Sequence, residues 1–196
     1  MILPIVAYGD PVLRKKATAI SEDFSKLDAL IENMFDTMYG ARGIGLAAPQ
    51  IGLPIRLFIV DATPFGDDDD LSEAERAVCA DFKKVFINPK ITEETGDEWV
   101  FNEGCLSIPN INEDVFRQPV VTITYQDENF EKHTETYDGM VARIIQHEYD
   151  HIEGILFTDK LSVLKKRLLK SKLTNISKGK IDVAYRMKFP QAKKKR

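Results

Sequence analysis

Residues 146–151, with the sequence QHEYDH, constrain this chain more than any other segment. Residues four positions apart lie on one face of a helix, so His147 and His151 can bind the same metal ion. Glu148 is at the wrong spacing to bind the same metal ion, but it can accept or donate a proton beside the metal. The flanking residues favour a buried helix over a solvated one with two surface histidines. They are largely apolar and include Met140, Val141, Ile144, Ile145 and Ile152.

The length and composition are those of one soluble globular domain. With 196 residues, 43% of them hydrophobic, the chain can bury a sizeable core. We expect this domain to span residues 1–175 and a basic tail to follow over residues 176–196. The net charge of −4 hides an acidic run at 67–70 and basic runs at 165–167 and 193–196. The basic runs suggest a polyanionic partner, and solvated charges that keep the protein soluble are the simpler alternative.

Cysteine content and hydropathy indicate the cellular compartment of the protein. Only two cysteines, Cys79 and Cys105, occur in the sequence. The first residues form too short an apolar run for a signal peptide, and no later segment has the length needed to span a bilayer. We therefore expect a cytoplasmic location, with no structural disulfide and no membrane partner.

Local patterns predict a helix and several strands in the first two thirds of the chain. Apolar residues recur at helical spacing over 24–38 and predict a helix that ends in a left-handed cap at Gly40. Short β-rich runs predict strands over 55–60 and 85–87, and residues 120–137 predict a hairpin.

The sequence predicts a surface position for the polar segment 65–84 and for His133, and His133 is assigned no role. Residues 65–84 are acidic and predict a surface excursion with a helical turn around 72–78, not a separate domain. His133 lies among Lys and Thr on a predicted strand, and we expect it to be exposed.

Two helices are expected near the end of the chain. Asp138 should cap the helix that carries His147, and this helix should stop at Gly154. An amphipathic helix from about residue 158 to 173 should pack on the body through one apolar side. The leucines of that side are Leu161, Leu164, Leu168 and Leu169.

A third metal ligand is needed, because catalytic divalent sites generally keep three protein ligands and one position for water. Cys105 is the best candidate. It follows Gly104, which lets the backbone approach another element, and Pro109 ends the pairing. Cys79 lacks a neighbouring glycine turn, and we interpret it as a small buried hydrophobe.

A glycine-rich stretch at 43–50, with the sequence GIGLAAPQ, is the third informative segment. Alternate glycines allow a backbone to lie against a ligand or a neighbouring strand, and Gln50 offers an amide donor and a carbonyl acceptor. The stretch lacks the Gly-Lys-Ser/Thr ending of phosphate-binding loops, which disfavours a nucleotide site. A tightly packed loop without a ligand is the alternative interpretation.

Together the three segments resemble the bacterial-type peptide deformylases, whose signatures GxGxAAxQ, EGCLS and HExxH occur in this order. The resemblance covers roughly residues 1–160. It implies an α+β fold of mixed, mainly antiparallel strands packed around a central metal-binding helix, which agrees with the predicted elements and the C-terminal amphipathic helix. It also implies that Cys105, His147 and His151 bind one divalent metal ion. Ferrous iron is implied as the working metal, and Zn²⁺ or Ni²⁺ could substitute because they bind more tightly.

The resemblance also implies roles for the residues around the metal. Glu148 would act as general base and acid, Gln50 and the backbone N–H of Leu106 would face the substrate oxygen, and Gly45 would contact the peptide backbone. The reaction implied is removal of the formyl group from the N-terminal methionine of newly made chains, with release of formate. An apolar pocket for that methionine would be lined by Ile44, Phe101, Arg143 and Ile144.

Two interactions are predicted beside this site. We expect Glu103 to form an ion pair with Arg117, at the start of the following strand, and so to fix the loop that carries Cys105. We also expect that the C-terminal helix and basic tail could contact ribosomal RNA, since Lys and Arg bind phosphates without reading sequence. A solvated end is the alternative, and we expect no DNA partner.

Two other functions share part of the pattern. Zinc endopeptidases carry the same helix motif, but they commonly complete the site with a glutamate or a third histidine. A ribosome-binding or nascent-chain-binding module could keep the metal as a structural clamp. Closed structural sites have four protein ligands, and the sequence offers three convincing ones.

Overall fold

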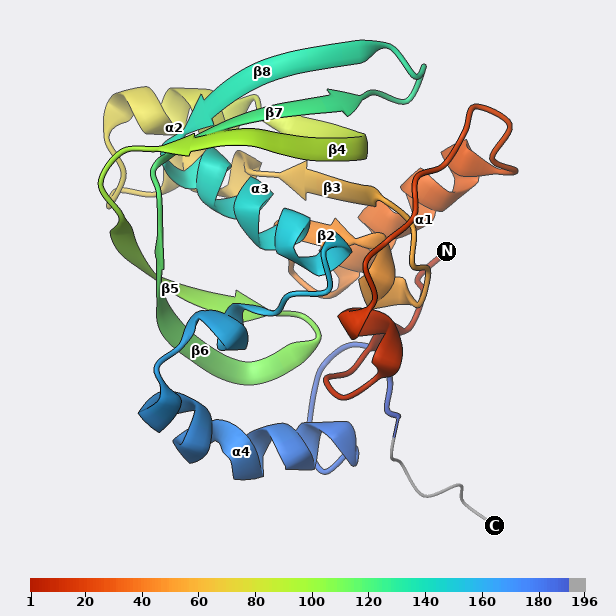
Figure 1. The fold of residues 1–196 in the computed structure, drawn as a ribbon, viewed down its shortest axis with the longest axis vertical. Coiled ribbons are helices and arrows are strands. Elements are labelled where there is room, and N and C mark those ends of the chain that lie inside the picture. Colours follow the sequence, from red (N-terminus) through yellow and green to blue (C-terminus); the bar gives the residue numbers. More distant parts are fainter. Residues whose placement is uncertain (191–196) are drawn as a thin grey trace.

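The helix of the HExxH motif, α3 (Gly139–Ile152), lies at the centre of the computed structural model, which describes residues 1–190. Figure 1 shows α3 between a five-stranded sheet and a separate hairpin. Its apolar residues are buried on several sides of the helix, including Ile144, Ile145 and Ile152. A helix of this kind belongs in a core, so the prediction of a buried motif helix is confirmed.

The large sheet covers one side of α3 and is antiparallel at every pairing. Burial alternates along its strand β7, as expected where one face of a sheet is covered. In spatial order the strands are β2 (Gly45–Ala47), β3 (Leu57–Asp61), β4 (Lys83–Thr95), β7 (Val120–Gln126) and β8 (Lys132–Asp138).

The opposite side of α3 faces the hairpin of β5 (Trp99–Cys105) and β6 (Ile108–Arg117). A third sheet joins the two ends of the described chain, because β1 (Ile5–Val6) runs parallel to β9 (Met187–Lys188). The predicted α+β fold with mainly antiparallel strands around the motif helix is therefore confirmed, with this short parallel pair as the exception.

Three other α-helices complete the described fold. They are α1 (Leu27–Gly40), α2 (Glu73–Ala80) and α4 (Val163–Ser177), and short 3₁₀ segments lie at Pro11–Arg14, Ala48–Ile51, Thr63–Asp67 and Phe157–Lys160. Met34 and Met38 of α1 pack against β2 and β3, as expected for methionines that fill a core. Ser72 caps α2, so the helical turn predicted in the acidic excursion is present.

The predicted end of α1 is wrong in one detail. Gly40 is the last helical residue, and the left-handed residue is Arg42, with a φ of 58°. The turn closes where the Gly43 N–H donates to the carbonyl of Met38 at 2.8 Å.

Strand β4 is longer than the predicted strand at 85–87. It passes through Asn88 and Pro89 and continues to Thr95. The register with β7 shifts between Ile87 and Lys90, and such an irregularity tolerates a proline that cannot donate to the ladder. The predicted end of the strand at Ile87 is therefore wrong, because β4 continues beyond the register shift.

The boundaries of α3 agree with the sequence, but its N-terminal cap differs. Asp138 occupies the N-cap position without a side-chain capping hydrogen bond. At the other end Gly154 has a φ of 76°, in the left-handed region where glycine is favoured.

The predicted apolar side of the C-terminal helix is wrong at two of its four leucines, since Leu161 and Leu169 are buried. Ser162 caps α4, so Leu161 precedes the helix, and Leu164 and Leu168 are 68% and 70% exposed. Within α4 the buried apolar stripe combines the predicted Leu169 with Leu173 and Ile176, and these residues recur at i, i+4 and i+7.

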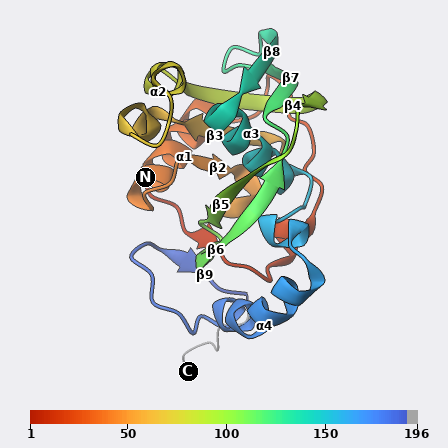
Figure 2. The same ribbon diagram turned by 90° about the vertical axis from the view of Figure 1, so that its left-hand side faces the viewer.

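The expected tail from residue 176 begins inside α4, which extends to Ser177. After α4 the chain returns to the body, where Met187 and Lys188 pair with β1. Figure 2 shows this stretch running from α4 to β9. The basic run at 193–196 lies outside the described residues. No helix within residues 1–190 is both long and apolar enough to cross a membrane.

Replacing Gly154 with alanine should destabilise the fold. A Cβ there would lie 2.8 Å from the carbonyl oxygen of Arg14, and the φ of 76° strains any L side chain. We expect Gly154→Ala to lower the free energy of unfolding by roughly 2 kcal/mol, measured by urea denaturation. Gly40→Ala is the matched control, because Gly40 is helical and its Cβ would meet only the flexible side chain of Ile2. Equal stabilities for the two variants would show that the fold does not depend on a glycine at position 154.

Candidate metal centre and active site

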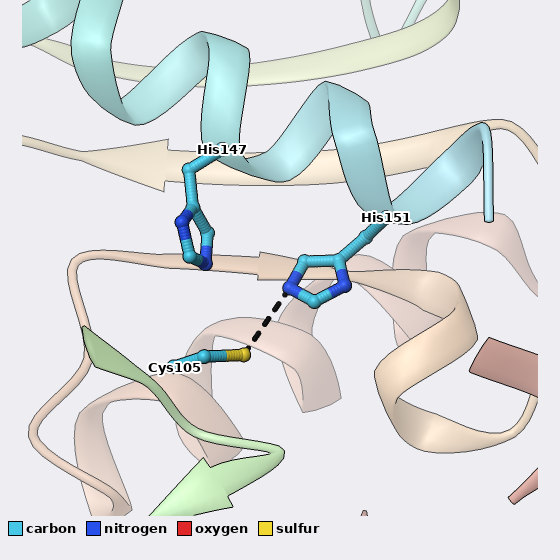
Figure 3. A group of neighbouring side chains, drawn as sticks. All are labelled: Cys105, His147 and His151. Carbon is cyan, nitrogen blue, oxygen red and sulfur yellow. Dashed lines mark hydrogen bonds between the residues drawn. The ribbon is translucent and has the colours of Figure 1, made fainter. Parts of the chain in front are cut away.

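Cys105, His147 and His151 converge in the structure (Figure 3). Cys105 ends β5, and both histidines project toward it from α3. One ligand atom from each residue lies within 4.8 Å of the others, and the Cys105 Sγ is 3.3 Å from the His151 Nε2. The three predicted ligands are therefore brought to one place from separate parts of the chain.

Two backbone periodicities produce this convergence. Glu103 and Cys105 are two residues apart on a strand, a spacing of about 6.7 Å on one face. His147 and His151 are four apart on a helix, a spacing of about 6 Å. These similar spacings let Glu103 meet His147 while Cys105 meets His151, although the register of β5 with β6 shifts between Glu103 and Cys105. Between the two strand residues, a Cβ at Gly104 would lie 2.8 Å from the Asn112 Nδ2.

The carboxylate of Glu103 orients the first histidine. Its Oε2 lies 2.9 Å from the Nδ1 of His147, which leaves the Nε2 of that ring for a metal ion. Burial raises the pKa of Glu103, but hydrogen bonds with His147 and Arg117 outweigh it and hold that pKa well below its usual range. Glu103 therefore stays ionised in the core.

The predicted ion pair between Glu103 and Arg117 is present and buried. The Arg117 Nε and Nη2 donate to the two carboxylate oxygens at 2.7 and 3.0 Å. The Arg117 Nη1 also donates to Asp150 of α3 at 2.7 Å, so one guanidinium joins the hairpin to the motif helix. Arg117 is the last residue of β6, not the first of the following strand as expected.

The residues present suit a divalent metal ion. One thiolate and two imidazoles are ligands that zinc, iron and nickel accept. Within residues 1–190 no fourth His, Cys, Asp or Glu joins this group, as a site with an open position requires. The buried Oε2 of Glu148 has no hydrogen-bond partner among residues 1–190. A buried carboxyl oxygen without such a partner needs a cation, a water molecule or a substrate nearby.

Glu148 lies next to the ligands and is only 4% exposed. Burial raises the pKa of its carboxyl to about 7, with the neighbouring His147 acting in the opposite direction. A carboxyl with that pKa can both take up and release a proton near neutral pH. Gly45 of β2 packs directly on it, since a Cβ at Gly45 would lie 2.5 Å from the Glu148 Oε1.

The side chain of Gln50 points toward the metal ligands. Its Oε1 accepts a hydrogen bond from the Ala47 N–H at 2.8 Å, which fixes the orientation of the amide. The Nε2 donor then faces the Cys105 Sγ at 3.6 Å and the Ser107 Oγ at 3.5 Å. Leu106 lies beside them in the two-residue turn between β5 and β6.

A cavity of about 590 Å³ opens beside Cys105, His147 and Glu148. Every residue predicted to contact substrate lines it, namely Ile44, Gly45, Phe101, Arg143 and Ile144.

Arg143 is only 2% exposed, and its charged end is engaged elsewhere. It donates to Glu103 at 3.0 Å and to the Trp99 carbonyl at 2.7 Å. The guanidinium also lies 4.2 Å from the centre of the Trp99 ring. Both Nη atoms of Arg143 are thus engaged by protein acceptors, whereas its buried Nε has no hydrogen-bond partner within residues 1–190.

Sequence reasoning missed some cavity residues. Met140 lines the cavity four positions before Ile144, so the helical period could have found it. Ile111 and the segment 182–185 also line it. No periodic pattern places that segment there, because its position depends on the pairing of β9 with β1.

His133 and Cys79, to which the sequence assigned no role in the site, lie outside it. His133 is partly exposed at the β7–β8 hairpin, where its Nε2 lies 2.8 Å from Asp127, in a separate group that includes Glu131. Cys79 is buried in α2, as expected for a small hydrophobe, and burial raises the pKa of its thiol. Neither cysteine forms a disulfide within the described residues.

Hydrolysis with a metal ion needs three protein donors, a free coordination position and a group that moves protons. The fold and the site satisfy these needs and place the chain in the class of metal-dependent hydrolases.

Comparison with known proteins makes the assignment specific. The family model described as polypeptide deformylase matches residues 2–167. The peptide deformylase of Christiangramia forsetii is 70% identical over 196 residues and that of Flavobacterium johnsoniae is 62% identical, each match covering 100% of both chains. The chain therefore belongs to the polypeptide deformylase family.

Solved structures agree with this membership. The crystal structure of a peptide deformylase from Legionella pneumophila has a TM-score of 0.77 and 38% identity, covering 92% of this chain and 98% of that one. Peptide deformylase 1B of Arabidopsis thaliana, in complex with an inhibitor, has a TM-score of 0.77 and 35% identity, covering 91% and 92%. The similarity thus includes the arrangement of the whole domain.

Replacing Gly45 with alanine should displace Glu148, because the added Cβ would lie 2.5 Å from the Oε1 and 2.8 Å from the Cδ of Glu148. We expect Gly45→Ala to lower hydrolytic turnover by about 10²-fold, which is the low end of what a misplaced proton-transfer group costs. Zinc content and thermal stability should be measured on the same sample. Turnover equal to that of the wild type in folded, metal-loaded protein would show that the close contact is unimportant.

Proposed function

We propose that this chain is a metal-dependent hydrolase that removes the formyl group from the N-terminal methionine of newly synthesised proteins and releases formate. The observation that carries the proposal is the convergence of Cys105, His147 and His151 beside the buried carboxyl of Glu148 and an open cavity. Membership in the polypeptide deformylase family supports the substrate.

A formamide is a stable amide, so its hydrolysis requires an activated water, stabilisation of the developing oxyanion and a proton for the departing amine. When bound by Cys105, His147 and His151, a divalent ion supplies the acidity that activates water near neutral pH. The protein's own residues supply the other requirements.

Glu148 would move the proton. Its carboxylate accepts a proton from the attacking water, and the resulting acid donates that proton to the leaving nitrogen. The raised pKa of about 7 supports both steps, because neither protonation state is strongly disfavoured at neutral pH. The lack of a partner for Oε2 within residues 1–190 leaves this atom available for both.

Gln50 and Leu106 would stabilise the oxyanion. The hydrogen bond from Ala47 fixes the Gln50 amide so that its Nε2 donor faces the site and does not need to reorganise during the reaction. The backbone N–H of Leu106 would be the second donor, from the turn next to Cys105. Removal of one such donor typically lowers turnover by about 10²-fold or more.

The methionine side chain would enter the apolar part of the cavity. Ile44, Phe101 and Ile144 supply its wall, with the stem of Arg143, and Gly45 leaves the substrate backbone room to lie along β2. Met140 adds a flexible, polarisable side chain to the same wall, which suits a thioether ligand.

We propose Fe²⁺ as the working metal, with Zn²⁺ or Ni²⁺ as substitutes that bind more tightly. The thiolate of Cys105 leaves the bound ion with a single net positive charge when both imidazoles are neutral. A structural clamp with four protein ligands is disfavoured, since no fourth candidate ligand joins the group in the part of the chain that is described.

Glu148→Gln should abolish most activity, because the amide keeps the shape of the side chain but cannot carry the proton. We expect formate release from a formyl-Met peptide to fall by about 10²- to 10⁴-fold, measured anaerobically with defined Fe²⁺. Metal content should remain, since the three ligands are intact. Tyr149→Phe, one residue further along α3, is the matched control and should keep full activity.

Two outcomes would contradict the proposed function. One is a wild-type protein that releases no formate with any of the three metals. The other is a metal-loaded Glu148→Gln variant that retains the full rate. Cleavage of internal peptide bonds would instead indicate an endopeptidase.

We also propose that α4 contacts the ribosome in the cytoplasm, where formylated chains emerge. Its outer face combines apolar and basic side chains, since Val163 and Leu168 are both 70% exposed and lie among Arg167 and Lys170. Lys and Arg bind the phosphates of ribosomal RNA, and the apolar residues could pack against a neighbouring protein or base.

Charge reversal on α4 tests this contact. We expect Arg167→Glu/Lys170→Glu to weaken co-sedimentation with ribosomes about tenfold or more and to reduce the slope of log affinity against log salt by about 2, since two phosphate contacts are lost. Lys90→Glu/Lys132→Glu, on the large sheet, gives the same change in net charge and should bind as the wild type does. Equal loss in both variants would indicate a general effect of net charge.

A further inference from the structure

The turn of Leu106 and Ser107 is held from outside the hairpin at both of its carbonyl groups. The backbone N–H of Tyr8 donates to the Ser107 oxygen at 2.8 Å. The phenol of Tyr185 donates to the Leu106 oxygen at 2.7 Å. These two donors come from opposite ends of the described chain, and both reach the turn that follows Cys105.

The two ends are themselves joined, which makes the support rigid. The Ile5 N–H donates to the Arg186 carbonyl and the Ala7 N–H to the Lys188 carbonyl, both at 2.9 Å. Nearer to Tyr185, the side-chain amide of Asn110 in β6 donates to the Asp182 carbonyl at 3.1 Å. The segment 182–188 is thus fastened to β6 at one end and to β1 at the other.

This segment also lines the substrate cavity through residues 182–185. The ring of Tyr185 is partly buried, and burial keeps its pKa above the usual range, so its hydroxyl remains a donor at neutral pH. The contact with Leu106 is the one hydrogen bond that this hydroxyl makes within residues 1–190. Tyr185 therefore touches the turn directly and borders the place where substrate would lie.

We propose that Tyr185 is a positioning residue for the reaction, which acts by holding the carbonyl of Leu106 so that the N–H of the same residue keeps its orientation. The inference rests on the proposed role of that N–H as an oxyanion donor. Leu106 has two rotatable backbone bonds between its N–H and its carbonyl. Cys105, as a proposed metal ligand, would restrain the peptide group before Leu106. The hydroxyl of Tyr185 restrains the peptide group after it, through the Leu106 carbonyl.

The energetic argument follows from how oxyanion donors work. A donor is effective only when it already points at the developing charge, and small misplacements lower turnover strongly. Substrate binding depends on the cavity walls and not on this orientation. Loss of the Tyr185 hydroxyl should therefore affect kcat much more than KM.

Tyr185→Phe tests the proposal, because phenylalanine keeps the ring and removes only the hydroxyl. With a formyl-Met peptide and zinc-loaded or iron-loaded protein, we expect kcat to fall about tenfold and KM to change less than twofold. Hydrogen exchange of the amides in segment 104–109, followed by mass spectrometry, should become faster than in the wild type. The exchange measurement does not depend on activity.

Tyr39→Phe is the matched control, since it also removes a tyrosine hydroxyl that donates to another residue, the carboxylate of Asp61. It should leave kcat, KM and exchange of segment 104–109 unchanged. Unchanged kcat in Tyr185→Phe would overturn the proposal, whether or not exchange increases. So would equal losses in kcat and substrate affinity, which would make Tyr185 only part of the cavity wall.

The two proposals fail in different ways. If the wild type and Tyr39→Phe release formate while Tyr185→Phe does so at the same rate, the positioning role is wrong and the proposed function remains. If the wild type releases no formate, the proposed function itself is wrong.

Discussion

The ionised carboxylate of Glu103 is the contact on which the geometry of the candidate site depends. It accepts hydrogen bonds from Arg117 and Arg143 and lies 2.9 Å from the His147 Nδ1. A buried charge of this kind is tolerable only because its partners are charged and well aligned, and removing one partner typically costs about 3–5 kcal/mol. Since Arg117 also binds Asp150, the hairpin that carries Cys105 cannot shift relative to α3 without breaking the same network. The network therefore fixes the strand that carries Cys105 relative to the helix that carries His147 and His151.

Close packing determines the rest of the site. Glu148 needs a dry environment to raise its pKa, and Gly45 provides it by letting the β2 backbone lie against the carboxyl group. This close contact accounts for a glycine in the interior of a strand, where it is otherwise unfavourable.

The sequence predicted the site better than it predicted the limits of the elements. The ligands, Glu148 and the ion pair of Glu103 with Arg117 follow from short motifs whose chemistry leaves few alternatives. Leu164 and Leu168 were wrongly placed on the buried side of α4 because the helical period was counted from Leu161, which precedes the cap at Ser162. Strand β4 was cut short because a bulge at Pro89 has no clear signature. The return of the chain at β9 was missed, since a two-residue strand formed by pairing with β1 carries no periodic pattern.

The last of these differences bears on how the site is completed. The family model ends at residue 167, yet residues 182–185 line the cavity and Tyr185 binds the turn beside Cys105. The proposed ligands and the proposed proton carrier therefore lie in the part of the chain matched by the family model. Of the two outside contacts to the turn, that of Tyr8 lies in the matched part and that of Tyr185 lies beyond it. The segment of Tyr185 is tied to the body by the pairing of β9 with β1 and by the hydrogen bond from Asn110 to the Asp182 carbonyl. A change in the parallel pair should thus act on the turn of Leu106 through Tyr185, without altering any residue of the metal centre.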